Sequence, residues 1–454
     1  MLPDDVLLEI INFSVPKNYY ENHIVKWIRL AHVCRRWRRL IFQSPRRLNL
    51  RLVCTRSTPA RDTLDIWPPL PLIIHDIEKK PSDMDNIIAA LEHNNRVYRI
   101  ILSSSEIGFV TNSAAMQRPF PELTDLVLRN YGNKLESVIP NSFVGETAPR
   151  LQSLILHRVP FPGLPKLLLS ATHLVKLDIC CIPHLGYIPP ESMATCLSAL
   201  TSLESLRLYL NHPPPRPAPE SRYPPPHSLT RSILPSLTKI RFQGTGDYLE
   251  VILARIDAPR LDDLDIAFFN QLIFDTPQLS QFISRRSTFM ALEEAHIEFC
   301  YRTVTVEFPS QTSYGKLKVE IRCSVLEWQI SSLEQVCTSS LPPVSTLKDL
   351  YINGGSLGRR GQDDVENVGW LELLRPFAAV KNLYIHKKFV PGIAPALQEL
   401  VGGRTTEALP ALENLFLDGL LKWRPLHEGI KKFVAARGLT NHPVAFSCWD
   451  SYRE

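Results

Sequence analysis

Residues 151–156 read LQSLIL, residues 174–179 read LVKLDI and residues 203–208 read LESLRL. Each stretch has the pattern L-x-x-L-x-L, whose last two leucines are two residues apart. Residues two apart lie on the same side of a β-strand, so the pattern predicts a short strand with one apolar side. One such strand cannot bury that side alone, whereas parallel copies stacked on each other share one core.

The pattern recurs along most of the chain. Its ten copies begin at Leu123, Leu151, Leu174, Leu203, Leu237, Leu261, Leu292, Leu347, Val380 and Leu412. A plausible earlier copy begins at Val97. First positions are 23 to 34 residues apart, except for 55 residues between Leu292 and Leu347. That longer stretch predicts one irregular unit, with strands at 303–308 and 317–323 and a helix at 328–337.

The array resembles leucine-rich-repeat proteins over residues 97–420. The resemblance implies an α/β solenoid, a horseshoe with parallel strands on its concave face. That family usually has Asn or Cys at the ninth repeat position, and here only Asn211 and Cys300 fit. We therefore expect a distorted, loop-rich array. The alternative is an ordinary α/β protein with chance runs of leucine.

The N-terminus has a different pattern. Asp4 and Asp5 precede apolar residues at helical spacing, and a second helical run follows from Trp27 to Ile41. Three short motifs occur in this region: Leu2-Pro3, Val6-Leu7-x-x-Ile10 and Leu30-x-x-Val33-Cys34-Arg35-x-Trp37-Arg38-x-Leu40. In this order they resemble an F-box, a small all-α module.

The F-box resemblance implies a subunit of a Skp–cullin–F-box (SCF) ubiquitin ligase that docks on a Skp-family adaptor. An F-box followed by loose leucine-rich repeats resembles the F-box families of mushroom-forming fungi. The docking residues carried over are Leu2, Pro3, Val6, Leu7, Ile10, Val33, Cys34, Trp37 and Leu40. The segment 15–27 is longer than in a compact F-box. The alternative is a helical cap for the repeats.

The pattern predicts four segments. Residues 1–51 form the helical module, 52–96 a linker and N-terminal cap, 97–420 the repeats with a Pro-rich loop at 212–227, and 421–454 a C-terminal cap. In the cap, a helix that starts at Pro425 and ends at Gly438 is expected, followed by a strand at 444–448. The Pro-rich tract is either a linker or an SH3 or WW ligand.

Composition indicates a soluble intracellular protein. The chain has 454 residues with a net charge of +5 and nine scattered cysteines. We expect no signal peptide, membrane span, metal or cofactor, and a cytoplasmic or nuclear location. Eleven Lys/Arg and no acid between Lys26 and Arg61 leave nucleic-acid binding as a weaker alternative.

The residues between the repeat leucines are the candidate substrate-binding face. They are Arg129, His157, Lys176, Arg207, Tyr209, Lys239, Arg241, Asp263, Asp265, Glu294, Glu298, Asp349, Tyr351, Tyr384, Phe416 and Asp418. When every residue between the repeat leucines is counted, the first five units carry five Lys/Arg and two acids, Asp125 and Asp178, and the last five carry six acids and no Lys/Arg. This distribution predicts a face graded from basic to acidic.

No catalytic motif is found, and the glycine loop 354–358 lacks the order of a phosphate loop. The sequence therefore predicts a non-catalytic substrate receptor of an SCF ligase. A repeat scaffold without a ligase role is the main alternative.

Overall fold

The computed structural model of the chain describes residues 2–14, 26–44, 48, 50–65, 69–76, 84–105, 107–132, 138–210, 231–269, 271, 273–309, 315–355, 369–401, 404, 406–418, 428–440 and 442–449. The chain divides into two compact units, Met1–Ile188 and Pro189–Glu454. The Pro-rich tract 212–227, most of the segment 15–27 and most of the glycine loop 354–358 lie outside the described residues.

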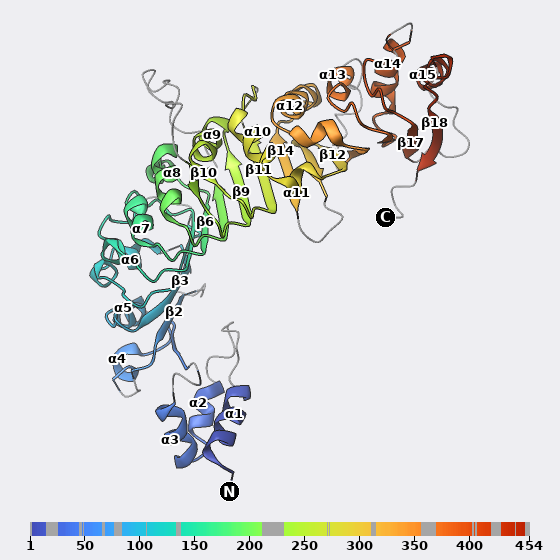
Figure 1. Cartoon of the computed structure of the whole chain (residues 1–454). Helices are drawn as coiled ribbons and strands as arrows, with labels where there is room; N and C mark the ends of the chain where they lie inside the picture. Colours follow the sequence, from blue (N-terminus) through green and yellow to red (C-terminus); the bar gives the residue numbers. More distant parts are fainter. Residues whose placement is uncertain are drawn as a thin grey trace. The chain divides into compact units, whose positions relative to one another are not determined.

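The first unit begins with three helices and continues with alternating strands and helices (Figure 1). Its elements are α1 (Asp4–Ser14), α2 (Lys26–Ala31), α3 (Arg35–Gln43), β1 (Leu52–Cys54), α4 (Ala60–Thr63), β2 (Leu72–Asp76), α5 (Met84–Leu91), β3 (Val97–Ser104), α6 (Ile107–Thr111), η1 (Ala114–Gln117), β4 (Asp125–Asn130), η2 (Phe143–Glu146), β5 (Ser153–His157), α7 (Leu164–Ser170), β6 (Lys176–Cys180) and η3 (His184–Gly186).

The second unit repeats the alternation of strands and helices. Its elements are α8 (Pro190–Ala199), β7 (Ser205–Tyr209), β8 (Ser232–Ile233), β9 (Lys239–Gly244), α9 (Gly246–Arg255), β10 (Ile256–Asp257), β11 (Asp263–Phe269), α10 (Pro277–Ser284), α11 (Ser287–Met290), β12 (Glu294–Cys300), β13 (Thr303–Phe308), β14 (Lys316–Arg322), α12 (Leu326–Ser339), η5 (Pro342–Thr346), β15 (Asp349–Gly354), α13 (Trp370–Leu374), β16 (Asn382–Ile385), α14 (Val390–Glu399), β17 (Asn414–Asp418), α15 (Glu428–Leu439) and β18 (Ala445–Trp449).

The three N-terminal helices enclose a small core. Asp4 and Asp5 lie in the first turn of α1, where acidic side chains favour the helix dipole. Leu8 and Ile11 of α1 are buried, as is Ile41 of α3. An ion pair fastens α1 to α3, because Arg36 Nη2 lies 2.5 Å from Asp4 Oδ1 and also donates to the Leu2 carbonyl at 2.7 Å. Arg36 thus holds these two helices together.

The L-x-x-L-x-L segments form parallel strands in both units. In the first unit β1 to β6 pair in sequence order, all parallel. The leucines of one segment lie in register with those of the next, as Leu126 does with Leu154 and Leu154 with Leu177. All three are fully buried. The expected α/β chain with parallel strands is confirmed, whereas the horseshoe shape stays a prediction.

The segment expected to be a linker and cap, 52–96, adds two strands to this sheet. Cys54 of β1 pairs with Ile74 of β2, and Asp76 of β2 pairs with Leu102 of β3. Asp76 therefore occupies the repeat position at which later strands have a buried leucine, such as Leu102. Arg56, two residues after Cys54, occupies the same repeat position in the β1 unit. Both charged residues break the L-x-x-L-x-L pattern, and the sequence prediction missed these strands for that reason.

Arg56 and Asp76 compensate each other inside the core. Their side chains are 3% and 1% exposed. Arg56 Nε lies 2.5 Å from Asp76 Oδ1, its Nη2 lies 2.8 Å from Oδ2, and the same Nη2 donates to Ser104 Oγ at 2.9 Å. This bidentate ion pair offsets the free-energy cost of removing both charges from water.

The second unit contains an antiparallel insertion. Its strands are ordered β7-β9-β11-β14-β13-β12-β15-β16-β17-β18. β12 turns at Tyr301 and Arg302 into β13, β13 is antiparallel to β14, and β14 pairs with β11. The strands expected at 303–308 and 317–323 and the helix at 328–337 are present as β13, β14 and α12. Their strand order was not predicted.

The C-terminal elements differ from expectation at one glycine. The strand predicted at 444–448 is present as β18, which pairs parallel with β17. Ile430 and Phe433 of α15 are fully buried. Gly438 was expected to end this helix, but α15 continues to Leu439 and Gly438 lies inside it. Pro425 lies outside the described residues.

We predict that removing Asp76 alone lowers the stability of the fold more than removing Arg56 and Asp76 together. Asp76→Leu leaves a buried guanidinium without its carboxylate and should destabilise β1–β3 by about 3–5 kcal/mol. Arg56→Leu/Asp76→Leu restores two apolar positions and should recover most of that loss. Hydrogen exchange of the β1–β3 amides measures both variants. Equal protection in the single and double variants would contradict this account.

Candidate protein-docking surfaces

The nine predicted docking residues of the N-terminal helices fall into two groups. Leu7 and Leu40 are only 5% and 6% exposed and belong to the core of the helices. The other seven remain accessible and are Leu2, Pro3, Val6, Ile10, Val33, Cys34 and Trp37. Leu7 and Leu40 therefore support the surface and do not form it, which corrects that part of the prediction.

Helix α1 carries apolar residues on two sides. Leu7, Leu8 and Ile11 face the core. Val6, Ile10 and Phe13 are 42%, 41% and 89% exposed. Residues three and four apart are neighbours on a helix, so these three form one exposed stripe. The sequence prediction missed Phe13, although its distance of three residues from Ile10 was a usable signal.

The residues at the start of α3 expose a further apolar side chain. Cys34 is the N-cap of α3, and its Sγ accepts a hydrogen bond from the Trp37 amide at 3.5 Å. Val33, just before it, is 59% exposed, and Trp37 is half-buried. We call Leu2, Val6, Ile10, Phe13 and Val33 the exposed apolar residues of the helical module. Among these, Val6, Ile10 and Phe13 are neighbours on one helix and form the contiguous part of the exposed apolar surface.

The second candidate surface is the side of each sheet that bears the residues between the buried leucines, here called the x-face. In the first unit it carries basic residues at two separate places. Arg129 and His157 are in register on β4 and β5, and Lys176 is exposed on β6. Burial lowers the pKa of His157, and the neighbouring Arg158 and Arg129 lower it further.

The basic and acidic x-face residues of the second unit lie side by side. Lys239 of β9 is in register with Asp263 of β11, and Arg241 is in register with Asp265. Arg207 lies beside Arg241 and over the ring of Tyr209, 5.4 Å from its centre. Burial raises the pKa of Asp265, against the opposing effect of nearby cations.

The insertion changes the predicted charge gradient. Strands β14 and β13 lie between Asp265 and Glu294 and add five charged x-face residues that were not counted. These residues are Lys316, Lys318, Glu320, Arg322 and Glu307. Lys316 Nζ lies 2.7 Å from Glu307 Oε1, and Arg322 Nε lies 2.9 Å from Glu320 Oε1. The x-face therefore does not change steadily from basic to acidic, because paired charges of both signs lie on β14 and β13.

The last strands carry an ordered polar row on the x-face. Asp349, Asn382 and Asn414 are in register on β15, β16 and β17. Asn382 Nδ2 donates to Asp349 Oδ1 at 2.6 Å, and Asn414 Nδ2 donates to Asn382 Oδ1 at 2.7 Å. Glu294 continues this row on β12. The two hydrogen bonds fix these side chains across three strands, β15, β16 and β17.

A second row contains His386 and Asp418. The His386 Nε2 atom lies 3.3 Å from Asp418 Oδ2, and the two side chains are 12% and 2% exposed. Asp418 was expected to contact a substrate, but it is buried beneath this surface. Burial lowers the pKa of His386, although the nearby Asp418 carboxylate acts in the opposite direction. Glu298, on β12, is exposed.

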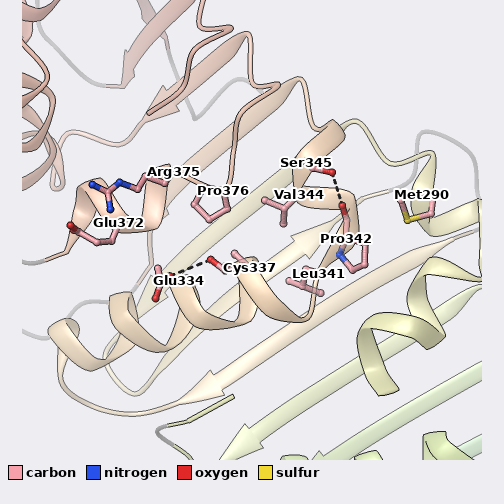
Figure 2. A pocket seen from close by; sticks show the side chains of 11 residues that line it. Met290, Glu334, Cys337, Leu341, Pro342, Val344, Ser345, Glu372, Arg375 and Pro376 are labelled. Carbon is pink, nitrogen blue, oxygen red and sulfur yellow. Dashed lines mark hydrogen bonds between the residues drawn. The ribbon is translucent and has the colours of Figure 1, made fainter. Parts of the chain in front are cut away.

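An open cleft of about 630 Å³ lies on the helix side of the second unit (Figure 2). It lies among α12, η5 and α13. Glu334 accepts a hydrogen bond from Thr338 at its wall, and Arg375 lies 2.7 Å from Glu407. Two of the charged groups that line the cleft, Glu334 and Arg375, thus already have partners.

Metal-ligand clusters and membrane-spanning helices are both absent from the part of the chain that the structure describes. No group of three or more His, Cys, Asp or Glu side chains is placed to hold a metal ion. No helix there is both long and apolar enough to cross a membrane.

The lowered pKa of His386 predicts a pH effect. A histidine whose folded pKa lies below its unfolded value, about 6.5, stabilises the fold above that pH and loses the effect as the pH falls. The melting temperature should therefore drop as the pH falls below about 6.5. His386→Gln should reduce the drop, and His442→Gln, at an exposed site, should not. An undiminished drop in His386→Gln would exclude this residue as the cause.

Comparison with known protein families gives one match. Residues 1–47 match the F-box-like family. No curated protein matches the chain. The matched residues include all three N-terminal helices and the exposed apolar residues on them. The N-terminal helical module of this chain is an F-box-like domain.

Proposed function

We propose that this chain is the substrate-recognition subunit of an SCF ubiquitin ligase. The F-box-like match at residues 1–47 supports this role, since domains of that family bind Skp adaptors. In this proposal the exposed apolar residues of the helical module dock on a Skp-family adaptor and, through it, on a cullin. The later strands, proposed to be leucine-rich repeats, bind a protein substrate in the cytoplasm or nucleus.

The exposed stripe on α1 is the observation that supports docking most directly. A helix that buries one apolar side in its own domain and exposes another has a second surface available for a partner. Val6, Ile10 and Phe13 together expose an apolar strip of about two turns, which suits a helix-in-groove contact. The Arg36–Asp4 pair holds the adjoining helix α3 beside it.

A receptor of this kind needs no catalytic residue of its own. It accelerates ubiquitin transfer by holding substrate lysines at high effective concentration beside a charged conjugating enzyme. The chain is therefore proposed to be a non-enzymatic subunit without a cofactor. A repeat scaffold with no ligase role is the second candidate, in which the F-box-like domain would not bind an adaptor.

Adaptor binding is tested by co-purification of the full chain with a Skp-family protein and by measuring the affinity. Ile10→Asp and Val33→Asp place a charge on the exposed surface and should each weaken binding at least about 30-fold, the size of a hot-spot residue of about 2 kcal/mol. Leu169→Asp is the matched control, because Leu169 is 48% exposed on α7.

Leu7→Ala is not suitable as a docking variant, because it removes a core side chain and should unfold the module. Circular dichroism of each variant checks that its helices remain. Binding by wild type and by Leu169→Asp, with loss in both surface variants, supports the proposal. No adaptor binding by the folded wild-type chain would refute it and leave the scaffold role.

A further inference from the structure

Four aromatic rings stack in one row on the x-face of the second unit. His296, Tyr351, Tyr384 and Phe416 come from β12, β15, β16 and β17 and are in register with one another. Consecutive ring centres are 4.4, 4.1 and 4.4 Å apart, and their planes differ by 16°, 7° and 7°. Both faces of each tyrosine are therefore covered by a neighbouring ring.

Trp449, the last residue of β18, crosses this row. Its ring centre lies 5.6 Å from that of Tyr351 and 5.3 Å from that of Tyr384, with interplanar angles of 61° and 69°. Because the tyrosine faces are already covered, the indole meets the tyrosine edges. Edge-to-face contact at this separation is favourable, and it uses only one face of the indole. Trp449 is half-buried, so part of its side chain remains accessible.

Carboxylates surround the aromatic row. Glu298 is exposed on β12, and Glu294 and Asp349 lie close enough to Tyr351 to affect its hydroxyl. Among the described x-face residues of β12 and β15–β18 there is no Lys or Arg. The nearby Lys316 is paired with Glu307, and Lys388 Nζ donates to the Gly355 carbonyl at 3.3 Å. Lys388 keeps its charge, because a carbonyl group is neutral, and Glu294 Oε1 is in contact with His296 Nε2. The surface still combines an indole ring with an excess of carboxylates, since Glu294, Glu298 and Asp349 outnumber Lys387 and Lys388.

We propose that this surface binds an arginine-bearing segment of a protein substrate. A guanidinium is planar, stacks on an indole face and is attracted by the ring, and tryptophan is the best side chain for this contact. Glu298 and Asp349 would accept its N–H groups. Nucleic acid does not suit the same surface, because stacking platforms for bases are lined by cations that hold phosphates.

This inference deepens the proposed function by naming a substrate class, and its test does not depend on adaptor binding. The full chain is titrated into a short fluorescein-labelled peptide of arginine, glycine and serine, and anisotropy is measured. The same peptide with citrulline in place of arginine keeps the shape but loses the charge. We expect the arginine peptide to bind at least about 10-fold more tightly than the citrulline peptide.

Two variants locate the site. Trp449→Leu removes the indole face and should weaken arginine-peptide binding about 10-fold or more, and Glu298→Gln should weaken it about threefold to fivefold. The matched controls are Trp328→Leu and Glu327→Gln, which change exposed residues of the same types on α12. Both controls should bind the peptide as wild type does.

The proposal is overturned if wild type binds the two peptides equally, or if Trp449→Leu binds as Trp328→Leu does. Preferential binding of single-stranded oligothymidine at this row would also overturn it. If Trp449→Leu fails to fold, Trp449→Phe, which keeps a weaker ring face, and Glu298→Gln carry the test. Failure of the chain to prefer the arginine peptide would not affect the proposal of adaptor binding. Failure to bind an adaptor would likewise not affect the peptide measurement.

Discussion

Parallel register is the constraint on which both units depend. Strands with a period of two place every second residue in the core, and pairing without slippage sets equal repeat positions beside each other in neighbouring units. Leu126, Leu154 and Leu177 form one buried line for this reason. A slip of one residue would expose that whole line, so the leucines fix the strand pairing and also fix which residues share the opposite face.

The same constraint gives meaning to the residues between the leucines. Tyr351, Tyr384 and Phe416 occupy one repeat position in consecutive copies, and register alone brings their rings within stacking distance. The hydrogen-bonded row of Asp349, Asn382 and Asn414 arises in the same way, two residues earlier in each strand. A surface property of the protein is thus a direct result of core alignment.

Departures from the repeat are as informative as its copies. Arg56 and Asp76 stand at inward positions and are tolerated because each neutralises the other at 2.5 and 2.8 Å. The β13–β14 insertion is accommodated because both strands alternate polar and apolar residues, so their apolar side joins the same core while their polar side joins the x-face. Neither feature has the L-x-x-L-x-L pattern, yet both extend the sheet.

The sequence by itself determined the parallel strands, their buried leucines, the helical N-terminal module and its F-box resemblance. Local periodicity carries this information, because apolar spacing of two or of three to four residues specifies a strand or a helix and its buried side. Only the tertiary structure decided that Leu7 and Leu40 are core residues while Phe13 is exposed, since both sides of α1 are apolar. It also decided the strand order around β12–β14, the Arg56–Asp76 pair and the crossing of Trp449 over Tyr351 and Tyr384. These depend on contacts between residues far apart in the chain, and no local pattern encodes which distant partner a side chain meets.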